Sequence, residues 1–124
     1  MRHIIQDSLV RDGASGTKRT FALTADVTLG PDATGTVYMN EASATVTATL
    51  PSAVALGTQY LFMMRTTDKI RITPASDDAL YIDGQKQTDG YYLELQSIGT
   101  WAIVTADDVG DWFVQWYGVV QMQP

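Results

Sequence analysis

The sequence lacks cysteine altogether, and it contains a single histidine, His3. Without cysteine, the 124 residues offer no disulfide, no zinc-thiolate site and no cysteine nucleophile. Because the only histidine lies at the N-terminal end, we do not expect a Ser-His-Asp catalytic arrangement. No apolar stretch reaches the length of a signal-peptide core or a membrane span, so we expect no membrane partner. Together these absences favour a protein that is not an enzyme.

One stretch resembles a phosphate-binding loop but fails on spacing. In GASGTKRT, two residues separate Gly13 from Gly16, whereas a P-loop has four residues between its glycines. The second glycine of a P-loop is followed directly by lysine, but here Thr17 intervenes before Lys18. We therefore expect no nucleotide cofactor.

Aspartates gather in several short segments, most closely at Asp107, Asp108 and Asp111. Calcium binds carboxylate and carbonyl oxygens, but this spacing does not fit an EF-hand loop. Aspartate and glycine are also the residues that tight turns require. We interpret these segments as turns and predict no metal requirement.

Basic residues are few, eight Lys and Arg against fourteen Asp and Glu, which gives a net charge of −6. They are also unevenly placed. Residues 1–20 carry four basic and two acidic residues (+2), so the remainder carries four and twelve (−8). An acidic body argues against nucleic-acid binding, which depends on neutralising phosphates. A basic arm on an acidic body favours docking onto another acidic protein surface. Alternatively, the basic residues only keep a loose terminus soluble.

Alternation of apolar and polar residues is the dominant pattern. In residues 20–29, TFALTADVTL, every second residue is apolar and most of the others are threonine or aspartate. Threonine, valine and aromatic residues suit a half-buried strand, and Gly-, Asp- and Pro-rich turns separate the runs. We predict strands near 3–10, 20–29, 36–40, 44–50, 57–65, 68–73, 79–83, 91–97, 100–105 and 111–119.

Such a series of short strands predicts an all-β fold, an antiparallel β-sandwich or jelly roll. Residues 20–124 form the single domain, and residues 1–19 form an N-terminal arm and hinge. The arm contains the apolar run HIIQDSLV, with Ile4 and Ile5, which suits adding a strand to an exposed sheet edge. The alternative is that this run is the ordinary first strand of its own sandwich.

Two predicted strands, 57–65 and 111–119, are apolar on both faces, so something must cover the second face. In the latter, Trp112 and Trp116 face one way while Phe113 and Tyr117 face the other. Phe113 and Tyr117 are candidates for a subunit interface, and the alternation leaves open which side of the strand faces the core. The three tryptophans, Trp101, Trp112 and Trp116, are candidates for the core or for stacking on a glycan, and the core or an interface is favoured.

Three segments together resemble small phage virion proteins: ATLPSAVALGTQYLF, KIRITPASDDALYIDG and YYLELQSIGTWAIVTADDVGDW. The shared pattern is Leu-Pro with small residues before Gly57, an aromatic strand, I-x-I-x-P ending at Pro74, and finally G-T-W and G-D-W. The resemblance covers about residues 20–117. It implies a β-sandwich or jelly roll that is commonly trimeric and has no catalytic activity.

Within that group, a small β domain with an arm and without a long repetitive shaft favours a capsid decoration (cement) protein. The resemblance then implies a homotrimer on the virion surface, made in the cytoplasm of the bacterial host and bound to the major capsid protein or another virion protein. The alternative is a receptor- or glycan-binding module of a tail fibre or baseplate. We expect no nucleic-acid partner. The interface candidates are Ile4, Ile5, Arg11, Lys18, Arg19, Phe113 and Tyr117.

Overall fold

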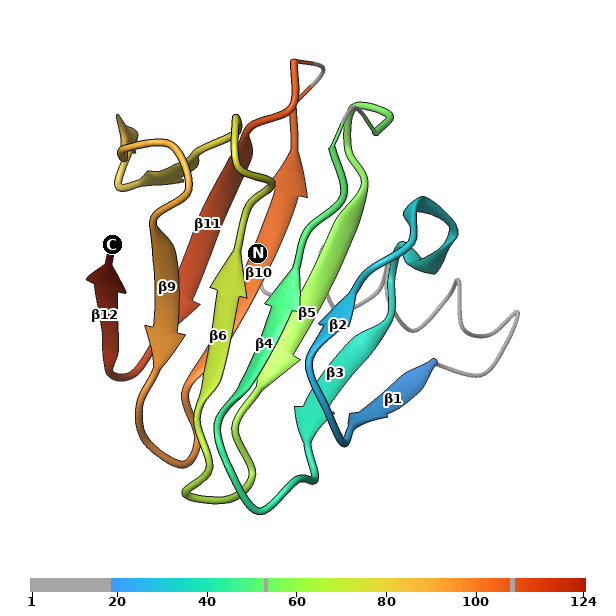
Figure 1. Ribbon diagram of the computed structural model, residues 1–124, viewed down its shortest axis with the longest axis vertical. Helices are drawn as coiled ribbons and strands as arrows, with labels where there is room; N and C mark the ends of the chain where they lie inside the picture. The colour runs from blue at the N-terminus through green and yellow to red at the C-terminus, as the bar shows by residue number, and fades with distance from the viewer. Residues whose placement is uncertain (1–18, 53, 108) are drawn as a thin grey trace.

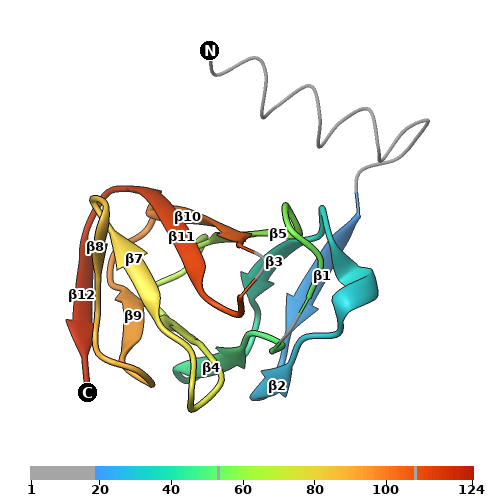
Figure 2. The ribbon, with the colours of Figure 1, turned by 90° about the horizontal axis from the view of Figure 1, so that it is seen from above.

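The computed structural model describes residues 19–52, 54–107 and 109–124, and these form two β-sheets packed against each other (Figures 1 and 2). The predicted strand at 3–10 lies outside the described residues. A short 3-10 turn, η1 (Pro31–Ala33), follows β2. Sheet A has the order β1 (Thr20–Leu23), β3 (Val37–Asn40), β5 (Gln59–Met63), β10 (Trp101–Ala106), β11 (Trp112–Tyr117), β7 (Leu80–Ile82) and β8 (Gln85–Lys86). Sheet B has the order β12 (Val120–Gln123), β9 (Tyr92–Leu95), β6 (Ile70–Thr73), β4 (Val46–Thr49) and β2 (Val27–Thr28).

The core lies between the two sheets and is built from alternate residues of each strand. Because successive side chains of a strand point to opposite faces, every second residue reaches the interior. Tyr60 and Phe62 enter from sheet A, and Ile70 and Ile72 enter from sheet B, all fully buried. The alternating runs of the sequence therefore form the two inner faces, and the predicted all-β sandwich is confirmed.

Strand pairing differs from the predicted antiparallel arrangement. Through β6 the chain alternates between the sheets, so that β1, β3 and β5 pair in parallel in sheet A, and β2, β4 and β6 pair in parallel in sheet B. Each connection crosses to the opposite sheet instead of turning back, so the next neighbour in a sheet runs in the same direction. From β9 onward the ladders within each sheet are antiparallel, whereas β7 pairs with β11 in parallel.

One predicted strand is divided between the sheets, and a second ends just before the chain crosses from one sheet to the other. The run 20–29 begins as β1 in sheet A and continues as β2 in sheet B, and the backbone crosses near Asp26. The run 111–119 ends as β11, and after Gly118 the chain enters β12 of the other sheet. A segment predicted as a turn, 83–90, contributes the short strand β8, which forms a hairpin with β7.

Candidate assembly face

The outer face of sheet A carries no charged residue on five neighbouring strands, β1, β3, β5, β10 and β11. Its residues occupy the positions that alternate with the inward-facing core residues. Apolar residues predominate, and the polar exceptions are threonine and glutamine. The face comprises Thr20, Ala22, Val37, Met39, Gln59, Leu61, Met63, Trp101, Ile103, Thr105, Phe113, Gln115 and Tyr117. In a protein of net charge −6, five adjacent strands without a charged residue on their outer side form an unusually large uncharged patch.

Aromatic pairs stand along the β11 side of this face. Trp101 of β10 lies beside Tyr117 of β11, with ring centroids 6.2 Å apart and planes 19° from parallel. Phe113 stacks on Tyr81 of the neighbouring strand β7 at 4.5 Å. Tyr117 remains 67% exposed and Phe113 45% exposed. Exposed aromatic rings next to one another mark surfaces that bind other molecules, because they lose much water-accessible area on contact.

The outer face of sheet B is polar and serves as an internal comparison. Threonines occupy β2 and β4, and glutamines occupy β12. Arg71 donates to the carboxylate of Glu94 at 2.8 Å, and its guanidinium lies 5.0 Å from the ring centroid of Tyr92. Gln96 donates to both Glu94 and Gln121. The charged and amide side chains of this face bond to one another, and the face is suited to contact with water.

We expect Glu94→Gln to destabilise the protein by about 1–2 kcal/mol at neutral pH, because Arg71 and Gln96 then lose the charged acceptor to which both donate. Burial of the Glu94 carboxyl raises its pKa, but the hydrogen bonds from Arg71 and Gln96 outweigh that effect and leave the pKa below 4.5. The stabilisation is therefore present above the unfolded-state pKa and is lost as the pH falls through the lower folded-state pKa.

The measurement is urea unfolding of both proteins from pH 7 down to pH 3. The difference between Glu94→Gln and the parent should shrink across the acidic part of this range. A difference that stays constant with pH would contradict the role assigned to the carboxylate. Thr49→Gln on the same face is the control, and we expect little effect from it at any pH.

The structure separates the sequence-predicted aromatic residues between the two faces of sheet A. Phe113 and Tyr117 lie on the outer face, while Trp112 is fully buried and Trp116 is partly buried against the core. Trp101 is not a core residue: it pairs across the strands with Met63 and Tyr117, whose side chains point outward. Tyr81 also belongs to this aromatic group, but it was not predicted from the sequence, because the strand that carries it has only three residues.

Arg19 directly precedes β1, and its Nη2 donates to the carbonyl of Thr34 at 3.0 Å. Of the other interface candidates in the arm, Ile4, Ile5, Arg11 and Lys18 lie outside the described residues. Arg19 is thus the one candidate of the arm whose surroundings are described.

Aspartates of the turn before β11 act as hydrogen-bond acceptors for the backbone. Asp107 Oδ1 accepts from the amides of Val109 (2.9 Å) and Asp111 (3.0 Å). Asp111 Oδ1 in turn accepts from the amide of Ala79 at 2.9 Å, and its other oxygen lies 3.5 Å from Lys86 Nζ. Within the described part of the chain, no group of three or more His, Asp or Glu residues is placed to hold a metal ion.

Comparison with protein-family models finds no match to this chain, and a search of curated proteins finds none either. Among the residues that the structure describes, no helix has the length and apolar character needed to cross a membrane.

Proposed function

We propose that this protein is a non-enzymatic structural protein that associates with copies of itself through the outer face of sheet A. The observation that carries the proposal is the absence of charge from that face across β1, β3, β5, β10 and β11. Copies of an acidic protein repel one another, and an uncharged apolar face is where contact meets the least repulsion. Burial of the exposed Phe113 and Tyr117 rings supplies the favourable free energy.

The resemblance to small phage virion proteins sets the proposed context. There the oligomer, most simply a trimer, is a capsid decoration (cement) protein that binds the major capsid protein or another virion protein and stabilises the shell. Binding to the assembled shell stabilises it by mass action, and such a role requires no catalytic group. Cryo-electron microscopy of the particle tests the location: density at capsid subunit junctions supports decoration, and density on the tail contradicts it.

Tyr117→Lys is expected to dissociate the oligomer into monomers. Tyr117 is 67% exposed in the single chain, so the substitution leaves the folded domain intact. A lysine buried in an apolar contact must lose its hydration without gaining a partner, which weakens association by tenfold or more, roughly 1.4 kcal/mol or above. Light scattering after size-exclusion chromatography measures the mass, and circular dichroism confirms that the domain is folded.

The matched control is Thr49→Lys, which adds the same charge on the outer face of sheet B. Its mass should equal that of the parent. A parent protein that is monomeric at tens of micromolar would contradict the proposal, and so would equal dissociation by the two lysine variants.

A second candidate function is glycan binding in a tail module. The observation in its favour is the parallel pair of rings at Trp101 and Tyr117, because flat aromatic faces stack on sugar rings. Binding to a glycan array that is lost in Trp101→Ala but retained in Trp116→Ala would support this alternative over shell decoration.

A further inference from the structure

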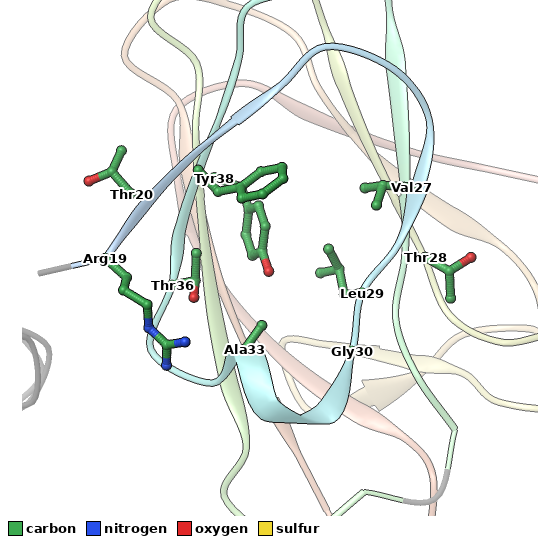
Figure 3. Close-up of a pocket in the computed structure, with 10 residues that line it drawn as sticks. Arg19, Thr20, Val27, Thr28, Leu29, Gly30, Ala33, Thr36 and Tyr38 are labelled. Atoms are coloured by element: carbon green, nitrogen blue, oxygen red, sulfur yellow. The ribbon is translucent and has the colours of Figure 1, made fainter.

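The sandwich is open at the end where β1 and β2 form the edges of the two sheets, and a cavity of about 290 Å³ lies between them (Figure 3). Val27, Leu29 and Ala33 point into this space toward Tyr38, while Thr20 and Thr28 point away. Phe21 also lines the cavity and is 51% exposed. The cavity is therefore an unfilled continuation of the core, open to apolar side chains from outside.

The backbone beside the cavity offers hydrogen-bonding groups to a further strand. The carbonyls of Arg19, just before β1, and of Leu23, at its end, accept from the amides of Val37 and Glu41 at 3.0 and 2.8 Å, so the backbone groups of these two residues face β3. Backbone groups of alternate residues point to opposite edges, and those of Thr20 and Ala22 therefore point away. Within the described residues, no strand pairs with that edge of β1. Such an edge is a template for strand addition.

We propose that residues 3–10 of a second copy of this chain add to the open edge of β1 and fill the cavity. This inference rests on the self-association proposed above, and it names a second contact between the copies. The segment HIIQDSLV is the apolar run of the 18 residues that precede the described structure, and the chain emerges at Arg19, on the rim of the cavity. Each copy thus has both an apolar segment and an open edge, so two copies can exchange the same contact.

Charge favours exchange between copies over pairing within one chain. Residues 1–20 carry +2 and the rest of the chain −8. An arm that binds its own domain leaves two acidic bodies facing each other, whereas an exchanged arm sets positive against negative charge across the contact. Arg19 is the charged residue among those lining the cavity. In an extended segment, Asp7 lies on the same side as Ile5 and Leu9. With that side facing the cavity, one acidic and two apolar side chains approach Arg19 and the cavity lining.

Area also favours an additional contact. Five strands of about five residues, spaced about 4.8 Å apart, present roughly 400 Å² in projection. One partner in a standard interface contributes about 800 Å². The outer face of sheet A is therefore of modest size for a stable contact, and an exchanged strand adds both apolar area and main-chain hydrogen bonds.

The absence of cysteine makes disulfide trapping a direct test on the full chain. Two single variants, Ile5→Cys and Phe21→Cys, are co-expressed, one of them with a tag that changes its mass. After mild oxidation we expect a mixed disulfide on a non-reducing gel, because residues opposite each other on paired strands bring their Cα atoms within the roughly 4.4–6.8 Å that a disulfide needs. The yield should exceed several-fold that of Ile5→Cys paired with Gln121→Cys, an exposed position on sheet B.

Ile4→Cys, on the opposite side of an extended segment, should crosslink to Phe21→Cys less than Ile5→Cys does. A double variant Ile5→Cys/Phe21→Cys that oxidises only within one chain would overturn exchange between copies. Yields equal to the Gln121→Cys control would overturn binding at this edge altogether. Light scattering of the same sample distinguishes the exchanged arm from self-association in general. An oligomer that forms no crosslinks would contradict the exchanged arm alone, whereas a monomer would contradict self-association as well.

Discussion

Replacing Trp112 with alanine should lower the free energy of unfolding by about 3–5 kcal/mol, the cost of truncating a large buried aromatic residue. The Trp112 side chain has no exposed area and packs against Tyr60, with ring centroids 5.5 Å apart. Its removal leaves a cavity between the sheets that neighbouring side chains from rigid strands fill only in part. Urea denaturation monitored by circular dichroism measures the loss.

The measurement is best made in the Tyr117→Lys background, so that dissociation does not contribute to the unfolding free energy. Gln115→Ala is the matched control, since Gln115 lies on the same strand but is exposed on the opposite face, and its effect should be within about 0.5 kcal/mol of zero. Trp112→Phe should cost much less than alanine, because Trp112 Nε1 has no hydrogen-bond partner among the described residues. Equal effects of Trp112→Ala and Gln115→Ala would contradict the assignment of the two faces.

The division of β11 into a core side and an exposed side follows from sequence alternation alone. Residues two apart share a face, so Trp112 and Phe113 must point in opposite directions wherever the strand lies. The sequence cannot tell which side is inside, because both sides are apolar. The structure supplies that information: Trp112 packs in the core between the two sheets, whereas Phe113 lies on the outer face, where it stacks on Tyr81 of the same sheet and stays 45% exposed.

Crossings between the sheets could not be located from alternation. Leu23 ends β1 of sheet A and Leu29 directly follows β2 of sheet B, yet both are buried in the same core, with 1% and 4% of their surface exposed. They are six residues apart, an even number, so the pattern continues across the crossing without a break in phase. The sequence therefore predicts one continuous strand in a region where the structure has two. The parallel pairing was not predicted for the same reason. Side chains alternate every two residues whether a strand runs parallel or antiparallel to its neighbour, so the alternation does not reveal the direction of pairing.

The open end of the sandwich likewise left no signal in the sequence. Val27 and Leu29 alternate as core residues do, and nothing in their spacing indicates that the sheet stops beside them. Whether a strand lies at an edge depends on which segments pair with it, and these contacts are distant in sequence. The apolar run in residues 3–10 was visible, but the structure was needed to identify an open edge that it could join.

The second large effect is expected at Gly118, where Gly118→Ala should cost about 2–4 kcal/mol through overpacking and backbone strain. This residue connects β11 to β12 and carries the chain from sheet A to sheet B with a φ of +105°. A Cβ atom added there would lie 2.4 Å from Thr100 Oγ1 and 3.0 Å from Thr100 Cα. The Thr100 hydroxyl cannot easily move, because it accepts from the Val119 amide at 3.0 Å and also lies 3.1 Å from Ser97 Oγ.

Two further glycines distinguish the cost of backbone strain from the cost of a steric clash with the added Cβ atom. Gly99 has a φ of +88° but open space where a Cβ would lie, so Gly99→Ala should show the backbone cost alone, about 1 kcal/mol. Gly30 has a φ of −89° and equally open space, and Gly30→Ala should be neutral or slightly stabilising because it restricts the unfolded chain. Thermal unfolding of the three variants should therefore rank Gly118→Ala well below Gly99→Ala, with Gly30→Ala at or above the parent. If Gly118→Ala were no worse than Gly99→Ala, the contact with Thr100 would not constrain the crossing.

Because β12 forms the outer strand of sheet B directly after Gly118, a distorted crossing should also weaken the pairing of β12 with β9. Faster amide exchange in residues 120–123 of Gly118→Ala would report this weakening.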